Sequence, residues 1–173
     1  MNSKLDFIFS RRSIRKFKPQ NVAPELLNDI LEAAAAVPSA MCRDPWRFLI
    51  IENHETLQKI SEIMPNGKFM ADAPMLIIIL GDIKEAHIES ESYMLQDCSA
   101  VIENILLAAN ALSLGTCWCG IHPREERVQG LKKLFNLPSN IIPIAGIVIG
   151  YPDESKESRT RFDANKVHYE KWN

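Results

Sequence analysis

The chain has 173 residues, of which 46% are hydrophobic and 24% are charged. A globular domain of this size buries roughly 70% of the surface of the unfolded chain, so these proportions exclude a disordered protein. The formal net charge of -2 excludes an overall basic surface for nucleic acid and the acidic composition of a solvating tail. Chemistry that depends on charge must therefore come from local clusters.

The start of the chain and its cysteines indicate the cellular compartment in which the protein is expected. The opening MNSKLDFIFS lacks the basic region, the apolar region and the cleavage site of a secretory signal, so we expect a cytoplasmic protein. The four cysteines are too few and too unevenly spaced for a disulfide framework, and we expect them to be reduced.

Hydrophobic periodicity and turn residues predict the elements of the first half of the chain. They are a short helix over 2–10, a helix over 21–37, a strand over 46–52, a helix over 54–64 and a strand over 74–80. The second helix has Pro24 near its first turn, a favoured position, and Pro38 follows its end. The strand over 74–80 is an unbroken apolar run, which is typical of a strand buried on both faces.

The most apolar region predicts a long helix over 90–114, about 37 Å at 1.5 Å per residue. Asp97, Glu103 and two asparagines interrupt it, which excludes a membrane span of about 20 apolar residues. Because apolar residues occupy most of its circumference, this helix must be covered on all sides. We therefore expect part of it to pack in a homodimer interface.

A new segment begins at 115–123, followed by a predicted helix over 123–135, a buried strand over 141–152 and a polar tail over 153–173. The tail carries two arginines and ends in the aromatic sequence HYEKW. No internal repeat, linker or low-complexity stretch interrupts the chain. We expect one domain over 1–173 with an α+β fold, in which helices surround a central sheet.

The run RRSIRKFK at 11–18 is the strongest local charge cluster. The guanidinium groups of Arg11, Arg12 and Arg15 offer planar forks of N–H donors suited to phosphate, and the Ser13 hydroxyl adds another donor. Arg159 and Arg161 form a second basic pair far along the chain. Two such clusters can close around one anion, although a single arginine taken alone is more often a solvated surface charge. No phosphate-binding glycine loop follows a strand, so side chains must hold the phosphate.

Four blocks, RRSIRKF, PSAMCRDPWRF, SLGTCWCGIHP and SRTRF, together resemble the FMN-dependent nitroreductase family in its small, single-domain form. The resemblance covers essentially the whole chain, with the blocks in the right order. It implies a nitroreductase-like α+β fold with a central mixed sheet. It also implies an obligate homodimer with a long interface helix and two FMN molecules between the subunits.

The resemblance further implies which residues hold FMN. The flavin phosphate, ribityl chain and pyrimidine edge would be contacted by Arg11, Arg12, Ser13, Arg15, Arg159 and Arg161. The other subunit would contribute Pro38, Ser39 and Ala40, and the position of Cys42 would lie at the pyrimidine edge. The isoalloxazine ring would lie against Trp118, Cys119 and Gly120, with a backbone N–H near Cys119 or Gly120 directed at flavin N5.

The activity implied by the resemblance is a ping-pong hydride transfer. NADH or NADPH would reduce the flavin, and a small nitroaromatic, quinone or flavin acceptor would then take the electrons. Positive charge from Arg15 near N1 and C2=O would stabilise the anionic reduced flavin. We name no catalytic side chain, because solvent or reduced flavin can protonate the product.

One block departs from the family pattern. The family commonly has Asn where this chain has Cys42 and Gln where it has Asp44. A thiol is a weak hydrogen-bond donor, so we expect cofactor affinity or flavin potential to differ from those of relatives.

Three alternatives stay open. Cys117, Cys119 and His122 are zinc-ligand types, but a spacing of one residue between the cysteines is not the usual two to four. The chain could then be a flavin- or metal-binding dimer without turnover. It could also carry out another flavin reaction, such as reductive dehalogenation, or be a structural dimer. The histidines have no companion Ser and Asp in a recognisable order for a hydrolytic triad.

Overall fold

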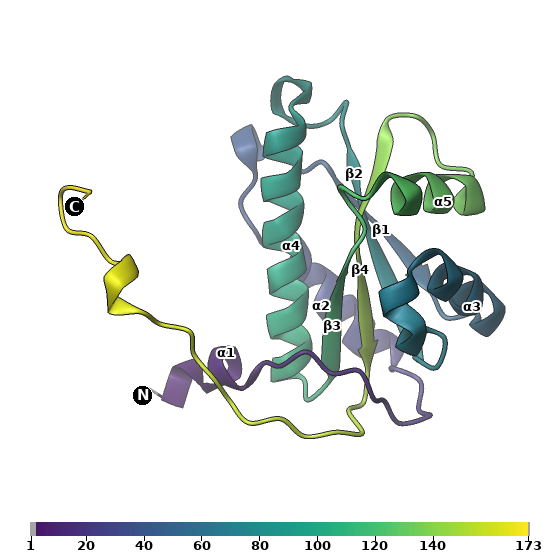
Figure 1. Cartoon of the computed structure of the whole chain (residues 1–173), viewed down its shortest axis with the longest axis horizontal. Coiled ribbons are helices and arrows are strands. Elements are labelled where there is room, and N and C mark those ends of the chain that lie inside the picture. Colours follow the sequence, from purple (N-terminus) through teal and green to yellow (C-terminus); the bar gives the residue numbers. More distant parts are fainter. Residues whose placement is uncertain (1–2, 173) are drawn as a thin grey trace.

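The computed structural model describes residues 3–172, and its centre is a four-stranded sheet with helices on both faces (Figure 1). The strands are β1 (Trp46–Ile51), β2 (Met75–Asp82), β3 (Gly115–Gly120) and β4 (Ile141–Gly150). The α-helices are α1 (Asp6–Ser10), α2 (Pro24–Ala35), α3 (His54–Ile63), α4 (Glu91–Ala111) and α5 (Glu125–Phe135). This architecture confirms the predicted α+β fold.

The sheet has the order β1-β2-β4-β3, and every pair of neighbouring strands is antiparallel. The expected mixed sheet is therefore corrected: within residues 3–172 the one parallel pairing is an isolated bridge between Ser13 and Thr116. The connections explain the difference. Between β1 and β2, for example, α3 and the 3-10 helix Pro65–Met70 together return the chain to the end of the sheet that it left.

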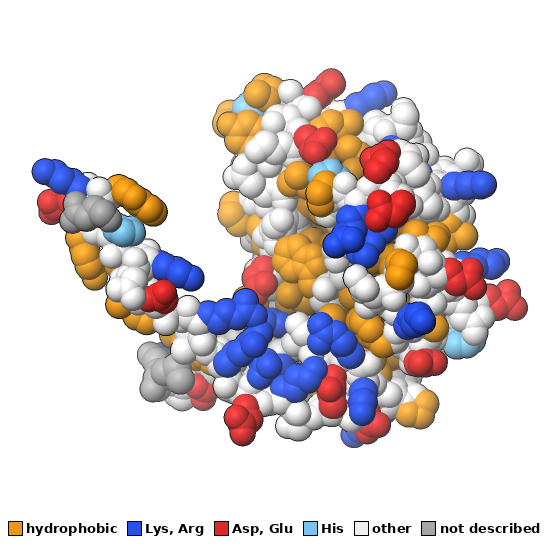
Figure 2. Space-filling model, viewed as in Figure 1, with side chains coloured by type: hydrophobic (Ala, Val, Ile, Leu, Met, Phe, Trp, Pro, Cys, Tyr) orange, Lys and Arg blue, Asp and Glu red, His pale blue; other side chains and the backbone are white. Residues whose placement is uncertain are grey.

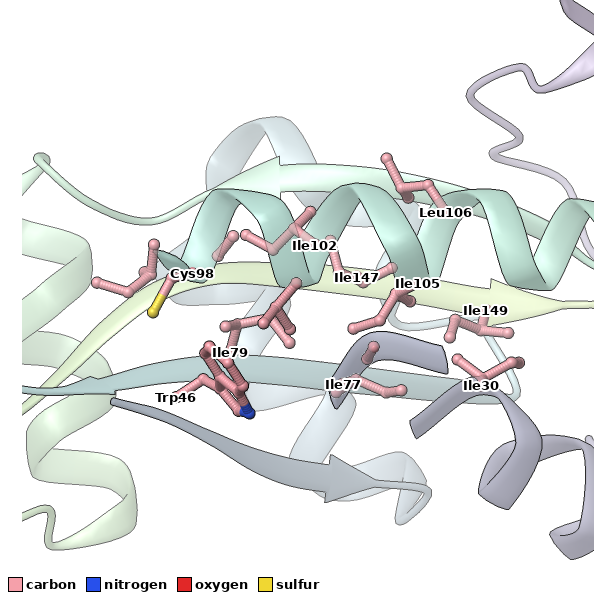
Figure 3. Close-up of a cluster of buried hydrophobic side chains, with 14 of the residues drawn as sticks. Ile30, Trp46, Ile77, Ile79, Cys98, Ile102, Ile105, Leu106, Ile147 and Ile149 are labelled. Carbon is pink, nitrogen blue, oxygen red and sulfur yellow. The ribbon is translucent and has the colours of Figure 1, made fainter. Parts of the chain in front are cut away.

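Strands β2 and β4 lie in the middle of the sheet and form its two-sided core. Ile77 and Ile79 of β2 pack in one cluster with α2 and α4, while Leu76 and Ile78 pack in a second cluster with α3 and α5. Figure 3 shows the first cluster, with Ile77, Ile79 and Trp46 gathered against α4. Alternate side chains of a strand point to opposite faces, so an unbroken apolar run covers both.

The helix α4 is shorter than the predicted 90–114 and ends at Ala111. Ser113 has φ 62°, a left-handed conformation of the kind that often ends helices, and the chain then turns into β3. One side of α4 packs on the sheet and α2, whereas Tyr93 is exposed and Leu107 is half-buried. The homodimer contact expected for this helix stays a prediction.

The remaining boundaries lie close to those predicted, except that β3 was not predicted as a strand. Asn2, which begins the first predicted helix, and Asn173, which ends the predicted tail, lie outside the described residues. Shorter 3-10 helices occur at Ser3–Leu5, Ala40–Cys42, His87–Glu89 and Ala164–Lys166. None of the helices in residues 3–172 is long and apolar enough to cross a membrane.

The segment after β4 first follows the body and then leaves it (Figure 1). Beyond residue 160 it carries three large side chains that are almost fully exposed: Phe162 at 77%, Tyr169 at 84% and Trp172 at 87%. Exposed aromatic groups gathered on one segment are typical of a surface that binds another protein.

Candidate cofactor-binding site

The basic run lies directly beside β3. Ser13 and Thr116 form the parallel bridge, and the Ile14 N–H donates to the Thr116 carbonyl over 2.8 Å. Gly115 permits this close approach, since a Cβ there would lie 2.9 Å from Ile14 Cβ. The fold thus places two of the sequence blocks, RRSIRKF and GTCWCG, next to each other.

The segment after β4 holds the other side of the basic run. Lys18 donates its backbone N–H to the Tyr151 carbonyl, and Asp153 donates to the Lys16 carbonyl, each over 2.9 Å. The Glu154 carboxylate accepts from the Arg15 backbone N–H over 2.6 Å. This hydrogen bond, with help from Lys156, lowers the pKa of Glu154 below its usual value although burial opposes the shift. These contacts therefore hold residues 151–154 beside the basic run, and so determine where the chain that leads to Arg159 and Arg161 leaves it.

Arginines from both parts of the chain meet in a hollow of about 260 Å³, the arginine hollow, lined by Ile8, Arg11, Arg159 and Arg161. Arg12 is close by and donates to the Glu157 carbonyl. Figure 2 shows the resulting blue patch on the body next to the tail. Repulsion from Arg161 and then from Arg12 lowers the pKa of Arg159. No ion pair found in residues 3–172 involves these arginines, so their charge is available to an anion.

A second cavity, the β3 cavity, has a volume of about 200 Å³ and lies between β3 and the 3-10 helix Pro65–Met70. Its lining comprises Arg15, Met64, Asn66, Gly67, Phe69, Met70, Cys117, Trp118, Cys119, Gly120 and Arg127. The Arg15 guanidinium carbon lies 5.9 Å from the centre of the Phe69 ring, a cation–π distance. Arg11 and Arg15 are about 13 Å apart along an extended segment, so the basic run joins the two cavities.

The edge of the sheet supplies backbone donors to the β3 cavity. Strand β3 is an edge strand, and its Thr116 carbonyl points away from β4 to accept from Ile14. Backbone groups alternate in direction along a strand, so the N–H groups of Trp118 and Gly120 also point to this open edge. A Cβ added at Gly120 would meet no atom within 4 Å, which leaves room for a flat group.

Arg127 of α5 closes the end of the β3 cavity and was not predicted as a site residue. It is only 7% exposed, and its Nη1 donates to the Gly120 carbonyl over 2.6 Å, while its Nε is buried without a partner. The periodicity of α5 could have indicated this residue, because Arg127 lies next to Val128 on the buried side. Asn66 was also missed, because no pattern in the segment around it pointed to a function.

Two thiols lie in the wall of the β3 cavity. A hydrogen bond with Cys119, together with the positive charges of Arg15, Lys156 and Arg11, lowers the pKa of Cys117 to about 7 although burial opposes the shift. The same hydrogen bond and burial raise the pKa of Cys119. For the zinc alternative, His122 instead contacts Glu91 over 3.2 Å, and residues 3–172 contain no group of three or more ligand-type side chains that could hold a metal ion.

The residues expected at the site divide into two sets. The structure gathers Arg11, Arg12, Ser13, Arg15, Trp118, Cys119, Gly120, Arg159 and Arg161 along β3 and the two cavities. It does not place Pro38, Ser39, Ala40 or Cys42 in the lining of either cavity. These four belong to a different loop, in which the buried Asp97 accepts the Ala40 N–H over 3.0 Å.

The chain is similar to known proteins over most of its length. The model of the nitroreductase family matches residues 8–67 and 64–151. A Methanothermobacter thermautotrophicus protein, named provisionally as an NADH dehydrogenase/NAD(P)H nitroreductase, is 44% identical over 168 residues, or 97% of this chain and 87% of that protein. The structure of an FMN-dependent nitroreductase of Clostridium difficile R20291 matches with TM-score 0.88 and 30% identity, over 96% of this chain and 98% of its own. A provisionally assigned nitroreductase of Desulfovibrio desulfuricans, solved in complex with FMN, matches with TM-score 0.84 and 28% identity, over 100% and 99% of the two chains.

Proposed function

Because this chain belongs to the nitroreductase family, we propose that it is an FMN-dependent oxidoreductase that passes electrons from NADH or NADPH to a small acceptor. The observation that carries the proposal is the meeting of Arg11 with Arg159 and Arg161 beside a sheet edge that offers free N–H groups. The arginine hollow suits the anionic end of a ligand, and the β3 cavity suits a flat ring with hydrogen-bonding groups at its other end. FMN has this shape and this distribution of charge.

The residues present fit FMN at each end. Arg11, Arg159 and Arg161 would hold the phosphate through charge-assisted hydrogen bonds. Along the run, Ser13 and Arg12 would lie beside the ribityl chain. Open space at Gly120 and the exposed Trp118 would accommodate the isoalloxazine ring. When bound, FMN supplies the two-electron chemistry that no amino-acid side chain provides.

The protein orients the ring and stabilises charge. The Gly120 N–H points to the open edge, where it can donate to flavin N5, and Arg127 fixes the following peptide, between Gly120 and Ile121, through the Gly120 carbonyl. Arg15 is held by its backbone contact with Glu154 and by the Phe69 ring, so it can place positive charge at the pyrimidine edge. Fixed donors of this kind stabilise negative charge on the reduced ring without reorganising.

We propose that a second subunit completes the site. Its Pro38, Ser39, Ala40 and Cys42 would approach the ring from the side that β3 leaves open. This loop is anchored to α4 by the hydrogen bond from the Ala40 N–H to Asp97, while Met41 is 75% exposed. The half-buried Leu107 of α4 and the exposed aromatic groups beyond residue 160 would lie between the subunits.

Nitroaromatic compounds, quinones and free flavin are the proposed acceptors. Each is a planar molecule that can stack on the exposed face of the ring and take two electrons in a ping-pong cycle. Anaerobic turnover with one acceptor of each class, with NADH and NADPH in turn, separates these reactions from one another and from reductive dehalogenation.

The test begins with the colour of the purified protein. We expect a yellow protein whose flavin absorption bleaches when NADH or NADPH is added without oxygen. Arg11→Ala should lose FMN on dialysis, whereas Arg124→Ala, which removes an exposed arginine outside both cavities, should retain it. A colourless protein that takes up no added FMN, or equal retention in the two variants, would count against the proposal.

A further inference from the structure

The β3 cavity contains two thiols, those of Cys117 and Cys119, that the proposed flavin reaction does not use. They are two positions apart in one strand, so their side chains point to the same face of the sheet. Cys117 is 2% exposed and Cys119 is half-buried, and both line the cavity. The Cys119 Sγ lies 3.7 Å from the Cys117 carbonyl oxygen, so it bends back toward its neighbour.

The surroundings give the two thiols different roles. Cys117 is affected by the Cys119 thiol and by the positive charges of Arg15 and Arg11 from the basic run and Lys156 from the later segment, while the charges of Arg15 and Arg127 act on Cys119. With a pKa of about 7, Cys117 is partly a thiolate at neutral pH, while Cys119 keeps its proton. A thiolate next to a thiol is the arrangement in which one sulfur attacks an oxidant and the other resolves the product.

The remaining buried cysteine shows the contrast. Cys98 of α4 is fully buried, and burial together with the negative charge of Asp97 raises its pKa to about 12. A thiol in that state is inert at neutral pH, because the thiolate is the reactive form.

We propose that Cys117 and Cys119 form a thiol pair that reacts with hydrogen peroxide, with Cys117 as the attacking thiolate and Cys119 as the resolving thiol. A cavity of about 200 Å³ and the low exposure of Cys117 favour an oxidant as small as peroxide over bulky disulfides. The pair is a site of oxidative modification that goes beyond the proposed hydride transfer.

The reaction balances in two steps. The Cys117 sulfur attacks one peroxide oxygen, the O–O bond breaks, and the departing hydroxide takes a proton to become water, which leaves a sulfenic acid on Cys117. The Cys119 sulfur then attacks the Cys117 sulfur, the S–O bond breaks, and a second water leaves with the Cys119 proton. Peroxide gains two electrons, and the thiol pair loses two as it becomes a disulfide. An external dithiol restores both thiols by exchange.

The strand geometry makes this disulfide easy to reduce. Two positions along a strand span about 6.8 Å between Cα atoms, and because both side chains stand on one face their Cβ atoms are about as far apart, beyond the roughly 3.5–4.5 Å of an unstrained disulfide. The bond therefore strains β3, and strained disulfides are the readily reduced ones. An edge strand can bend to form it because one side has no neighbouring strand over most of its length.

The experiment exposes the reduced protein, as purified and with FMN added, to hydrogen peroxide, blocks free thiols with N-ethylmaleimide and maps the peptides by mass. In the FMN-free protein we expect Cys117 and Cys119 to escape alkylation together, with the peptide lighter by two hydrogen atoms, and dithiothreitol to restore both. Bound FMN should slow the reaction, because the proposed function places its ring in the same cavity. Cys119→Ser should trap the sulfenic acid on Cys117 as a dimedone adduct, and Cys117→Ser should leave Cys119 fully alkylated. Cys98→Ser is the matched control and should behave as the unaltered protein.

The pH dependence separates a specific thiolate from general oxidation. Because the hydrogen bond with Cys119 is the main cause of the lowered pKa of Cys117, dimedone labelling of Cys119→Ser should speed up with pH to a midpoint above 7 and then level off. Adding Arg15→Ala should move this midpoint to higher pH. Peroxide-treated protein in which N-ethylmaleimide still alkylates both thiols would overturn the proposal. So would dimedone labelling of Cys119 in Cys117→Ser that equals the labelling of Cys117 in Cys119→Ser. FMN binding is read by absorbance, so this proposal and the proposed function fail separately.

Discussion

The arginine hollow and the β3 cavity differ in what holds them together. The hollow is made of exposed and half-buried side chains from two distant segments, and its shape depends on backbone hydrogen bonds that join Lys16, Lys18 and Phe9 to the segment 151–159. The cavity is built on the edge of the sheet and is backed by the buried side chains of Met64 and Met70. Charge is screened by salt, whereas the direction of a peptide group in a sheet is not. We infer that the hollow determines how tightly the ligand is held and that the cavity determines how the ring is oriented.

The largest effect should come from removing two of the three arginine charges that line the hollow. Replacing Arg159 and Arg161 together by Ala should weaken FMN affinity at least about 100-fold, since each charge-assisted hydrogen bond contributes about 1.5–3 kcal/mol. The Kd, measured by fluorescence titration, should also respond less to added salt than that of the unaltered protein. If the salt dependence stays unchanged, the phosphate is not held in the arginine hollow.

A smaller effect should come from the cavity, and it should appear in the rate. Gly120→Ala fills open space and meets no neighbouring atom, so the Tm should stay within a few degrees of that of the unaltered protein. The added methyl group should displace the ring and slow reduction by NAD(P)H roughly 10- to 100-fold in stopped-flow absorbance, with little change in Kd. A weaker affinity for FMN with an unchanged rate of flavin reduction would instead show that Gly120 helps to hold the cofactor.

The smallest effect concerns the contact that aligns the two segments. Glu154 has a pKa below its usual 4.5, so its charge stabilises the folded chain above pH 4.5, and this contribution is lost as the pH falls through the lower folded value. Glu154→Gln should therefore lower the free energy of unfolding by less than about 1 kcal/mol at pH 7. The free energies of unfolding of the two proteins, measured by urea titration, should become equal well below pH 4.5. A difference that persists there would show that the charge is not responsible.

Much of the fold could be predicted from periodicity, because α2, α3, α5, β2 and β4 are long and strongly patterned. The resemblance to the nitroreductase family is likewise confirmed by the family model and by relatives along nearly the whole chain. Strand β3 was not predicted, because GTCWCG combines two glycines and two cysteines and has little of the β-branched character of a typical strand. Its position is determined by β4 and by the basic run, and both contacts are distant in sequence.

The candidate site could be predicted only where charge or motif was visible. The arginines at 11, 12, 15, 159 and 161 stand out as cations, and the structure does bring the two clusters together. The assignment of each residue to FMN stays a prediction. Arg127 and Asn66 could not be recognised because their role depends on where α5 and the 3-10 helix Pro65–Met70 pack against the end of β3.

The pairing of an early and a late segment across β3 has a consequence for biosynthesis. Residues 151–161 are synthesised after the four strands and α1 to α5, so every element of the core has been made before half of the arginine hollow is added. Anchoring a phosphate in this hollow therefore requires a segment made after the core to dock beside residues 11–18.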